Sequence, residues 1–169
     1  MVTQNDNSAR RVGKILQFNV MEYHTTDLDK FISSIHYLGY TPAGAKLRLG
    51  VLEDGIKVIG AMMWGRPSSK SLDQEKILEL TRMVMVDDTD KFAESHSLAL
   101  ARKYIRQHHP QVKLVIAYSD PEQNHDGGIY EADNWCELGY TDGGVWTSIS
   151  KPNRRDAAQG KKLRWVRSP

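Results

Sequence analysis

The chain has 169 residues and a mass of 19.2 kDa, a length that suits one domain with a sizeable core. Apolar residues make up 40% and charged residues 26%, as in ordinary soluble globular proteins. The single cysteine, Cys136, cannot form an internal disulfide, and neither a membrane-spanning run nor a signal peptide is recognisable. These features exclude a secreted disulfide scaffold, a membrane protein and a disordered chain, and they predict a cytoplasmic protein.

The charges are distributed unevenly, although the net charge is only +2. Acidic residues outnumber basic ones before residue 151, whereas the last segment is rich in Lys and Arg. We therefore divide the chain into a polar segment 1–13, a folded domain 14–150 and a basic tail 151–169. Basic side chains beside an aromatic ring can neutralise phosphates and stack on a base, so the tail is a candidate nucleic-acid contact. The candidate residues are Arg154, Arg155, Lys161, Lys162 and Arg164. A merely solubilising tail is the alternative.

Hydrophobic periodicity predicts ten elements, which suggest one mixed α/β domain. The first half reads as a strand at 14–22, a helix from a Thr26 cap to Gly39, and strands 46–53 and 57–65 joined by an Asp54-Gly55 hairpin turn. The second half reads as a strand at 77–86, a helix at 91–108, a strand at 112–119, a helix at 129–138 and a hairpin at 139–150. The strand at 112–119 is almost continuously apolar, which favours a central position in a sheet with helices on both faces.

Arg82 stands in an otherwise apolar row of the strand at 77–86, together with Leu78, Leu80, Val84 and Val86. A buried guanidinium needs a partner anion. The anion is either a core carboxylate or a bound substrate or cofactor, and the sequence does not choose between them.

Asp120 ends the apolar strand, at the edge where open α/β sheets place their ligands. The polar loop 124–128 then leads into a helix on which Ile129, Ala132 and Cys136 form the expected core stripe. Tyr130 flanks that stripe, and we expect it to face Asp120 across one pocket. The structural alternatives are a turn-forming aspartate and a core tyrosine.

His36 and Tyr37 close the first predicted helix and point about 100° apart while it stays helical. Both reach one site only if the helix unwinds before Gly39. His36, Asp120 and His125 with a tyrosine could also supply nitrogen and oxygen donors to a transition metal, although their spacing matches no established metal motif.

Three motifs together resemble the phage Mom family of DNA modification proteins. They are the His36-Tyr37 pair, Leu80-Thr81-Arg82, and the run SDPEQNHDGGIYEADNWCELGY from 119 to 140. The resemblance covers about 36–140, and its last motif is the specific one. That family is itself similar to the GNAT acyltransferases, so the resemblance implies a single GNAT-like domain.

The GNAT likeness implies an acetyl-CoA or related acyl-CoA cofactor. By this resemblance the backbone of Val84 and Val86 would pair with pantetheine, and the segment 91–95 would meet the pyrophosphate, with Ser95 as the best single candidate. The chain departs from the usual phosphate-binding loop, because it reads DKFAESHS there and brings Glu94 close to the phosphates.

The Mom likeness implies conversion of adenine in double-stranded DNA to an N6-carbamoylmethyl form, which protects phage DNA from restriction in the host bacterial cytoplasm. Asp120 would orient or deprotonate the amine, Tyr130 would donate a proton, Arg82 would stabilise negative charge, and His36 and Tyr37 would complete the pocket. The target base would be flipped out against aromatic rings such as Tyr37, Trp64 or Trp135. A redox metal, iron first, is a further implication for His36, Tyr37 and Asp120.

Two other functions fit the same sequence. One is an acetyl-CoA-dependent N-acetyltransferase that acts on a small amine or a protein, with Tyr130 as its acid. The other is a DNA-binding accessory protein without catalytic activity. Either a monomer or a homodimer is compatible with the sequence.

Overall fold

A computed structural model describes residues 17–142 and 160–169. Within them, β1 (Phe18–Glu22), β2 (Ala45–Glu53), β3 (Lys57–Gly65), β4 (Ile77–Met85), β5 (Leu114–Ser119), β6 (Cys136–Tyr140) and β7 (Leu163–Arg167) form one sheet. The strand order is β1-β2-β3-β4-β5-β7-β6, and every neighbouring pair is antiparallel except β4 and β5. The mixed central sheet of the sequence analysis is confirmed.

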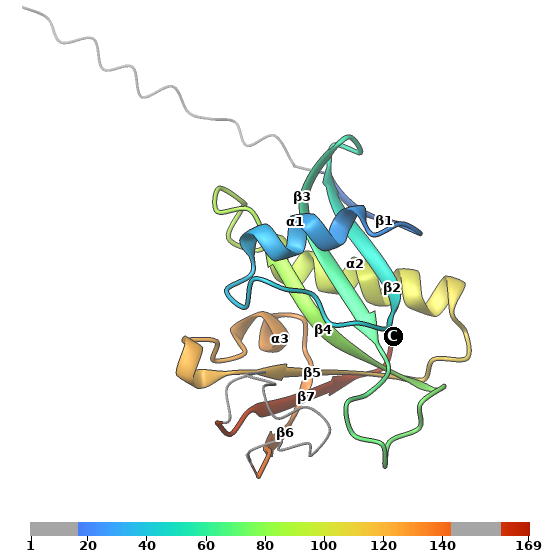
Figure 1. The fold of residues 1–169 in the computed structure, drawn as a ribbon, viewed down its shortest axis with the longest axis vertical. Coiled ribbons are helices and arrows are strands. Elements are labelled where there is room, and N and C mark those ends of the chain that lie inside the picture. Colours follow the sequence, from blue (N-terminus) through green and yellow to red (C-terminus); the bar gives the residue numbers. More distant parts are fainter. Residues whose placement is uncertain (1–16, 143–159) are drawn as a thin grey trace, which may run out of the picture.

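Helices cover both faces of this sheet, as predicted (Figure 1). The helix α1 (Asp27–Ile35) packs Leu28 and Ile32 against one face, and α2 (Ala93–His108) packs Leu98 and Ile105 against the other. Alternation along β3 serves both layers, because Met62 and Trp64 join the α2 cluster while Ala61 and Met63 join the α1 cluster. Among the described residues, no helix combines the length and apolar character that a membrane span requires.

The local signals for turns and caps are only partly confirmed. Asp54 and Gly55 both have positive φ, at 50° and 75°, as the two central residues of the turn that the Ile56 amide closes on the Glu53 carbonyl within the three-residue connection 54–56. The Thr26 capping box is wrong, because the Thr26 side chain makes no cap hydrogen bond. Instead, the neighbouring Thr25 hydroxyl donates to Asp27 at 2.6 Å.

The helix expected at 129–138 is much shorter than predicted. After a single 3-10 turn (Pro121–Gln123), α3 spans only Gly128–Ala132, and Asn134 turns into the left-handed region at φ 54°. The chain then continues as β6, so Cys136 is exposed rather than part of a helical core stripe. Asn tolerates this conformation better than most residues, which is why the chain can reverse there.

Part of the segment assigned to the basic tail is a strand of the sheet. β7 lies between β5 and β6 and pairs with β5 along five positions, with the Trp165 side chain only 1% exposed. The expectations for segment 1–13 and for residues 143–150 of the last hairpin lie outside the described residues, as do Arg154 and Arg155.

Polar contacts fix the C-terminal strand against α2. Arg102 forms a two-point ion pair with Asp133, with both N–O distances 2.7 Å, and Asp133 also accepts a hydrogen bond from Trp135 Nε1 at 2.8 Å. Arg102 and Arg167 extend this network to the carbonyl groups of Ser168 and Asp133. These contacts therefore tie α2 both to β7 and to the residues that follow α3.

Candidate functional site

The candidate site lies where β4 and β5 separate. The two strands pair at only three positions, the last being Glu79 with Ile116. Beyond this point β4 continues beside β3 and β5 continues beside β7, so the facing edges of β4 and β5 run apart (Figure 1). We call this opening the seam. It leaves backbone groups of β4 without a strand partner, which is the kind of edge that an extended ligand can occupy.

A β-bulge at Thr81 decides which way Arg82 points. Met63 pairs with Arg82 but Trp64 pairs with Leu80, so Thr81 is an extra residue in β4, and its hydroxyl donates to the Met63 carbonyl at 3.0 Å. The bulge reverses the alternation of side chains beyond it. Leu80 therefore faces α2, whereas Val84 faces α1, and the expected single apolar row containing Arg82 does not exist.

Arg82 is half-buried and held by main-chain groups and a ring. Its Nη1 donates to the Thr81 carbonyl at 2.6 Å and its Nε to the Tyr40 carbonyl at 3.4 Å, while its Cζ lies 5.2 Å from the centre of the Tyr40 ring. Within the described part of the chain it forms no ion pair with a carboxylate, so the core-carboxylate alternative is not observed there. The guanidinium charge remains available to a ligand.

His36 and Tyr37 lie just beyond α1, because the helix ends at Ile35 and His36 has an extended backbone. Their rings stack with centres 4.5 Å apart, and the condition that the helix must unwind before both can serve one site is met. Burial, aided by the Arg82 charge, lowers the pKa of His36 to about 4, so its imidazole is neutral near pH 7. Its Nδ1 accepts a hydrogen bond from the Leu38 amide at 3.2 Å, which leaves the proton on Nε2.

Asp120 and His125 approach the same rings from the end of β5. Asp120 is 4% exposed; its Oδ1 accepts the Glu122 amide at 3.1 Å, whereas its buried Oδ2 has no hydrogen-bond partner in the described residues. The His125 ring centre lies 5.9 Å from that of Tyr37. Burial and the Asp120 charge raise the pKa of Tyr37, so this phenol stays protonated. From the sequence His125 was considered only as a possible metal donor, and its position beside the Tyr37 ring was not predicted.

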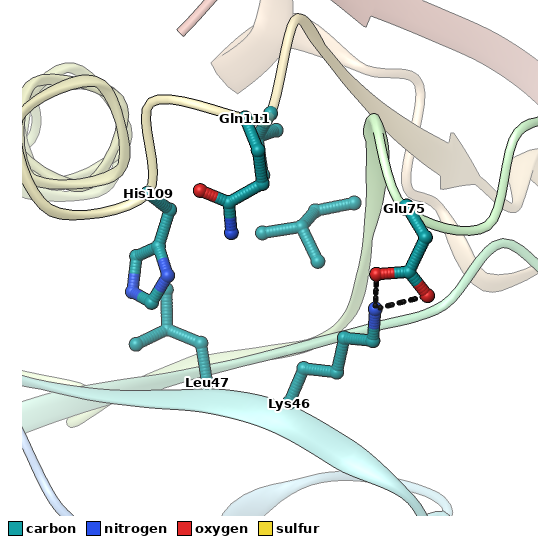
Figure 2. A pocket seen from close by; sticks show the side chains of 7 residues that line it. Lys46, Leu47, Glu75, His109 and Gln111 are labelled. Atoms are coloured by element: carbon teal, nitrogen blue, oxygen red, sulfur yellow. Dashed lines mark hydrogen bonds and ion pairs between the residues drawn. The ribbon is translucent and has the colours of Figure 1, made fainter.

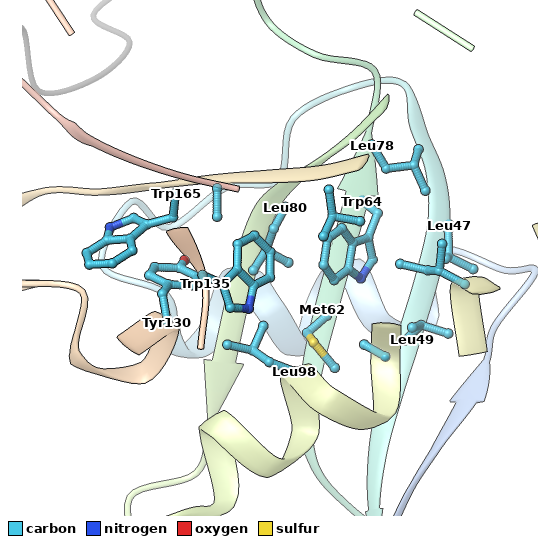
Figure 3. Packing of buried hydrophobic residues seen from close by; sticks show 14 of the residues in the cluster. Leu47, Leu49, Met62, Trp64, Leu78, Leu80, Leu98, Tyr130, Trp135 and Trp165 are labelled. Carbon is cyan, nitrogen blue, oxygen red and sulfur yellow. The ribbon is translucent and has the colours of Figure 1, made fainter. Parts of the chain in front are cut away.

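Tyr130 belongs to a separate group on the α2 side of the sheet. It stacks on Trp165 at 5.7 Å and packs against Trp135 at 5.2 Å (Figure 3). Trp165 in turn donates to the Ser119 hydroxyl at 2.9 Å, on the face of β5 opposite to Asp120, because the backbone at Asp120 is still extended. The expected single pocket shared by Asp120 and Tyr130 is therefore not what the structure shows.

Burial, together with the charge of Glu94 at the start of α2, raises the pKa of Tyr130 far above its usual range. Glu94 thus lies near enough to affect the phenol electrostatically. Trp64 and Trp135 are 0% and 5% exposed, so they are core residues and the prediction that they contact a flipped base is wrong.

The motifs that meet at this site match one known family. A sequence profile of the Mom protein family matches residues 17–163. The chain belongs to the Mom family. One Mom relative is the methylcarbamoylase of Escherichia phage Mu, which is 30% identical over 116 residues, or 64% of this chain. The matched region spans about half the length of that relative, at 48%.

Solved structures similar to this Mom-family chain are acetyltransferases. An aminoglycoside acetyltransferase in complex with coenzyme A superposes with a TM-score of 0.64 at 10% identity, covering 90% of this chain and 95% of its own. The spermidine/spermine N-acetyltransferase of Vibrio cholerae gives 0.61 at 13% identity, with 90% and 92% covered. A GNAT-family acetyltransferase of Streptococcus pneumoniae gives 0.58 at 9% identity, with 90% and 100% covered. These values confirm the GNAT-like fold.

The donor groups of this Mom-family site do not fit the predicted metal. His36 Nδ1 already accepts a backbone hydrogen bond, so its Nε2 carries a proton and has no lone pair for a cation. No group of three or more His, Cys, Asp or Glu side chains suited to a metal occurs in the described residues. Iron is therefore not supported, and no step below depends on a metal.

The predicted cofactor contacts of the Mom-family chain shift by one residue. The Val86 amide donates to the Ile59 carbonyl at 2.9 Å, so it points toward β3. Because backbone groups alternate along a strand, Val84 also points toward β3, and Met83 and Met85 offer their amides and carbonyls to the seam. Ser95 lies in the first turn of α2, beside a cavity of about 370 Å³ that Phe92 and Lys103 also line.

The other described cavity, of about 180 Å³, lies away from these residues. It adjoins the start of β4 and the loop after α2, and Figure 2 shows Lys46, Glu75, His109 and Gln111 around it. None of the residues predicted to act in catalysis lines this cavity.

Proposed function

We propose that this chain is a DNA-modifying transferase that converts adenine in duplex DNA to N6-carbamoylmethyladenine, with an acyl-CoA as the cofactor. The observation that carries the proposal is that residues of the separate family motifs meet at the mouth of the seam. Arg82 lies on one strand of the seam, Asp120 on the other, and the stacked His36 and Tyr37 lie beside them. The methylcarbamoylase activity in the name of the phage Mu relative supports this choice of reaction.

The seam suits the pantetheine arm of an acyl-CoA. Free amide and carbonyl groups of Met83 and Met85 can hydrogen-bond an extended chain, and the first turn of α2 with Ser95 lies beyond them. An acyl-CoA bound there would supply the carbon unit. Glu94 is unfavourable beside phosphates, so we expect modest affinity for the cofactor.

Asp120 and Arg82 would act on the adenine amine and on developing negative charge. The unpartnered Asp120 Oδ2 can accept a hydrogen bond from N6 and remove a proton from the amine. Arg82, which is held in place by Tyr40, can stabilise an oxyanion. Burial keeps Tyr130 protonated, and its phenol is the candidate proton donor to a CoA thiolate.

The product distinguishes this reaction from ordinary acetyl transfer. Attack of N6 on a thioester carbonyl forms an amide, whereas N6-carbamoylmethyladenine carries N6 on a methylene carbon. Direct attack on the carbonyl therefore does not yield the proposed product. DNA from cells that express the chain should contain the N6-carbamoylmethyl nucleoside by mass spectrometry, and DNA from cells expressing Asp120→Ala should not. Unmodified adenine together with an acetylated small amine would favour the N-acetyltransferase alternative.

Basic residues of the C-terminal segment would bind the flanking phosphates. Lys161 is exposed, and Lys162 and Arg164 are half-buried, Arg164 on β7 beside Tyr118. Deleting everything after Ser150 would also remove β7, so the sharper test is Lys161→Ala with Lys162→Ala. This double variant should bind duplex DNA more weakly than the wild type and with a shallower salt dependence. Salt-independent binding of the wild type would contradict a phosphate contact.

A further inference from the structure

Three aromatic rings from two segments of the chain lie together beside the seam, and two of them are stacked. His36 covers the Tyr37 ring at 4.5 Å with 26° between their planes, and the His125 ring centre lies 5.9 Å from Tyr37 with 37° between planes. Tyr37 is 51% exposed, so part of its ring remains open to a ligand. The pair of Tyr37 and His125 is therefore close but not in face-to-face contact.

The two sides of this pair differ in how firmly they are held. The His36 amide donates a hydrogen bond to the Ile32 carbonyl, and the His36 carbonyl accepts one from the Gly39 amide. Its ring nitrogen Nδ1 accepts a further hydrogen bond from the Leu38 amide. It thus forms a rigid support behind Tyr37. The exposed His125 side chain lies in a loop whose Gln123 and His125 amides donate to the Asp120 carbonyl at 3.0 and 3.1 Å, while no hydrogen bond to the His125 ring is observed in the described residues.

The spacing of Tyr37 and His125 is close to that of a sandwich with one planar base. Two contacts of about 3.5 Å, one on each face of a base, require roughly 7 Å between the outer rings. The observed 5.9 Å would have to grow by about 1 Å, and the tilt would have to close. A rotamer change of His125 on its exposed loop can supply that movement.

A donor group on the base would also satisfy the nearby acceptor. The Asp120 Oδ2 is buried and has no partner in the described residues, and the Asp120 charge acts on Tyr37. Buried acceptors are normally hydrogen-bonded, so an exocyclic amine close to Tyr37 fits this vacancy. Adenine presents such an amine at N6.

We infer that Tyr37 and His125 clamp the extruded adenine between their rings, with His36 supporting Tyr37 and the amine directed to Asp120. The inference rests on the proposed function, since it needs a duplex with one base flipped out. It gives Tyr37 a stacking role that requires its ring and not its hydroxyl.

The test measures how much an unpaired base contributes to DNA binding. Anisotropy compares a duplex that has adenine opposite an abasic site with the same duplex abasic at both positions. Wild-type protein should bind the adenine duplex about 5- to 150-fold more tightly, the range that base–aromatic stacking gives. Tyr37→Ala and His125→Ala should each reduce the preference to about threefold or less. Tyr37→Phe should keep it.

Matched controls are Tyr140→Ala and His24→Ala, which remove exposed rings outside the site and should keep the preference. Urea unfolding of each variant verifies that it is folded. No preference in the wild type, or an unchanged preference in both Tyr37→Ala and His125→Ala, would overturn the clamp. If DNA from cells that express the wild-type protein still contains the modified nucleoside in that case, the clamp alone has failed. If it contains none, the proposed function has failed as well.

Discussion

The two faces of the sheet use the same strands for different purposes. On the α2 face, Tyr130 and Trp165 pack together, and the ion pair of Arg102 with Asp133 is buried and complete. On the α1 face near the seam, Arg82 lacks a carboxylate partner in the described residues and Asp120 keeps a bare oxygen. The buried ion pair of Arg102 with Asp133 thus stabilises the α2 face, whereas the two charged groups that we propose for catalysis lie on the α1 face.

This difference originates in two irregularities of β4. The bulge at Thr81 moves Arg82 to the α1 side, and the separation from β5 after Glu79 opens an edge there. A regular β4 would instead have kept Arg82 in line with Leu80 on the α2 face. Substitution of Arg82 or Asp120 should therefore lower activity, whereas substitution within the buried Arg102–Asp133 pair should lower stability.

The largest effect on activity is expected for Asp120→Asn. The amide can still accept the Glu122 backbone hydrogen at Oδ1, but it cannot take a proton, so product formation should fall about 10²- to 10⁴-fold. The free energy of unfolding should stay the same or rise, because the buried unpartnered charge is removed. Nucleoside mass spectrometry and urea unfolding measure the two quantities. A stable variant with full activity would remove Asp120 from the chemistry.

The largest effect on stability is expected for Asp133→Ala. It leaves the Arg102 guanidinium, which is only 8% exposed, without its partner and should cost about 3–5 kcal/mol in the free energy of unfolding. Two controls locate the cause. Glu75→Ala breaks the exposed pair with Lys46 and should cost at most about 1 kcal/mol. Arg102→Met combined with Asp133→Leu removes both charges and should recover most of the loss, whereas no recovery would contradict an electrostatic cause.

Regular elements could be predicted from the sequence because each carries a local pattern. The Asp54-Gly55 turn and the apolar run of β5 depend on neighbouring residues alone, and both are where the sequence analysis expected them. The bulge at Thr81 has no such pattern, since the row of alternating side chains reads equally well without it. It is set by pairing with β3, which is distant in sequence.

β7 was overlooked although a signal is present. Leu163 and Trp165 alternate with Arg164 and Val166, a half-buried strand pattern that the surrounding positive charges obscured. The sequence indicated His125 only as a possible metal donor and did not indicate Tyr40, because their contacts with Tyr37 and Arg82 join separate segments of the chain. Side-chain convergence of this kind follows from tertiary structure and is not visible in spacing.

A smaller effect on activity is expected for Arg82→Lys. Lysine keeps the charge but cannot reach the Thr81 and Tyr40 carbonyls with two separate nitrogens, so the charge at the seam becomes less well placed. We expect about a tenfold loss of product formation with little change in stability. The matched variant is Arg48→Lys, which breaks the two-point pair with Asp29 that ties β2 to α1. That variant lies on the same face but outside the site, so it should lose stability and keep activity, and the reverse result would contradict the role assigned to Arg82.

The smallest effect concerns the pH dependence of stability through His36. Its pKa in the folded protein is about 4, below the ordinary histidine value of 6.5 expected after unfolding. As the pH falls below 6.5 the unfolded chain takes up this proton first, so the free energy of unfolding should decline down to about pH 4 and lose nothing further from this group below it. Urea unfolding across this range should show a shallower decline for His36→Gln, which cannot be protonated. Equal slopes would mean that the imidazole is solvated like an exposed one, and the rigid support behind Tyr37 would then be absent.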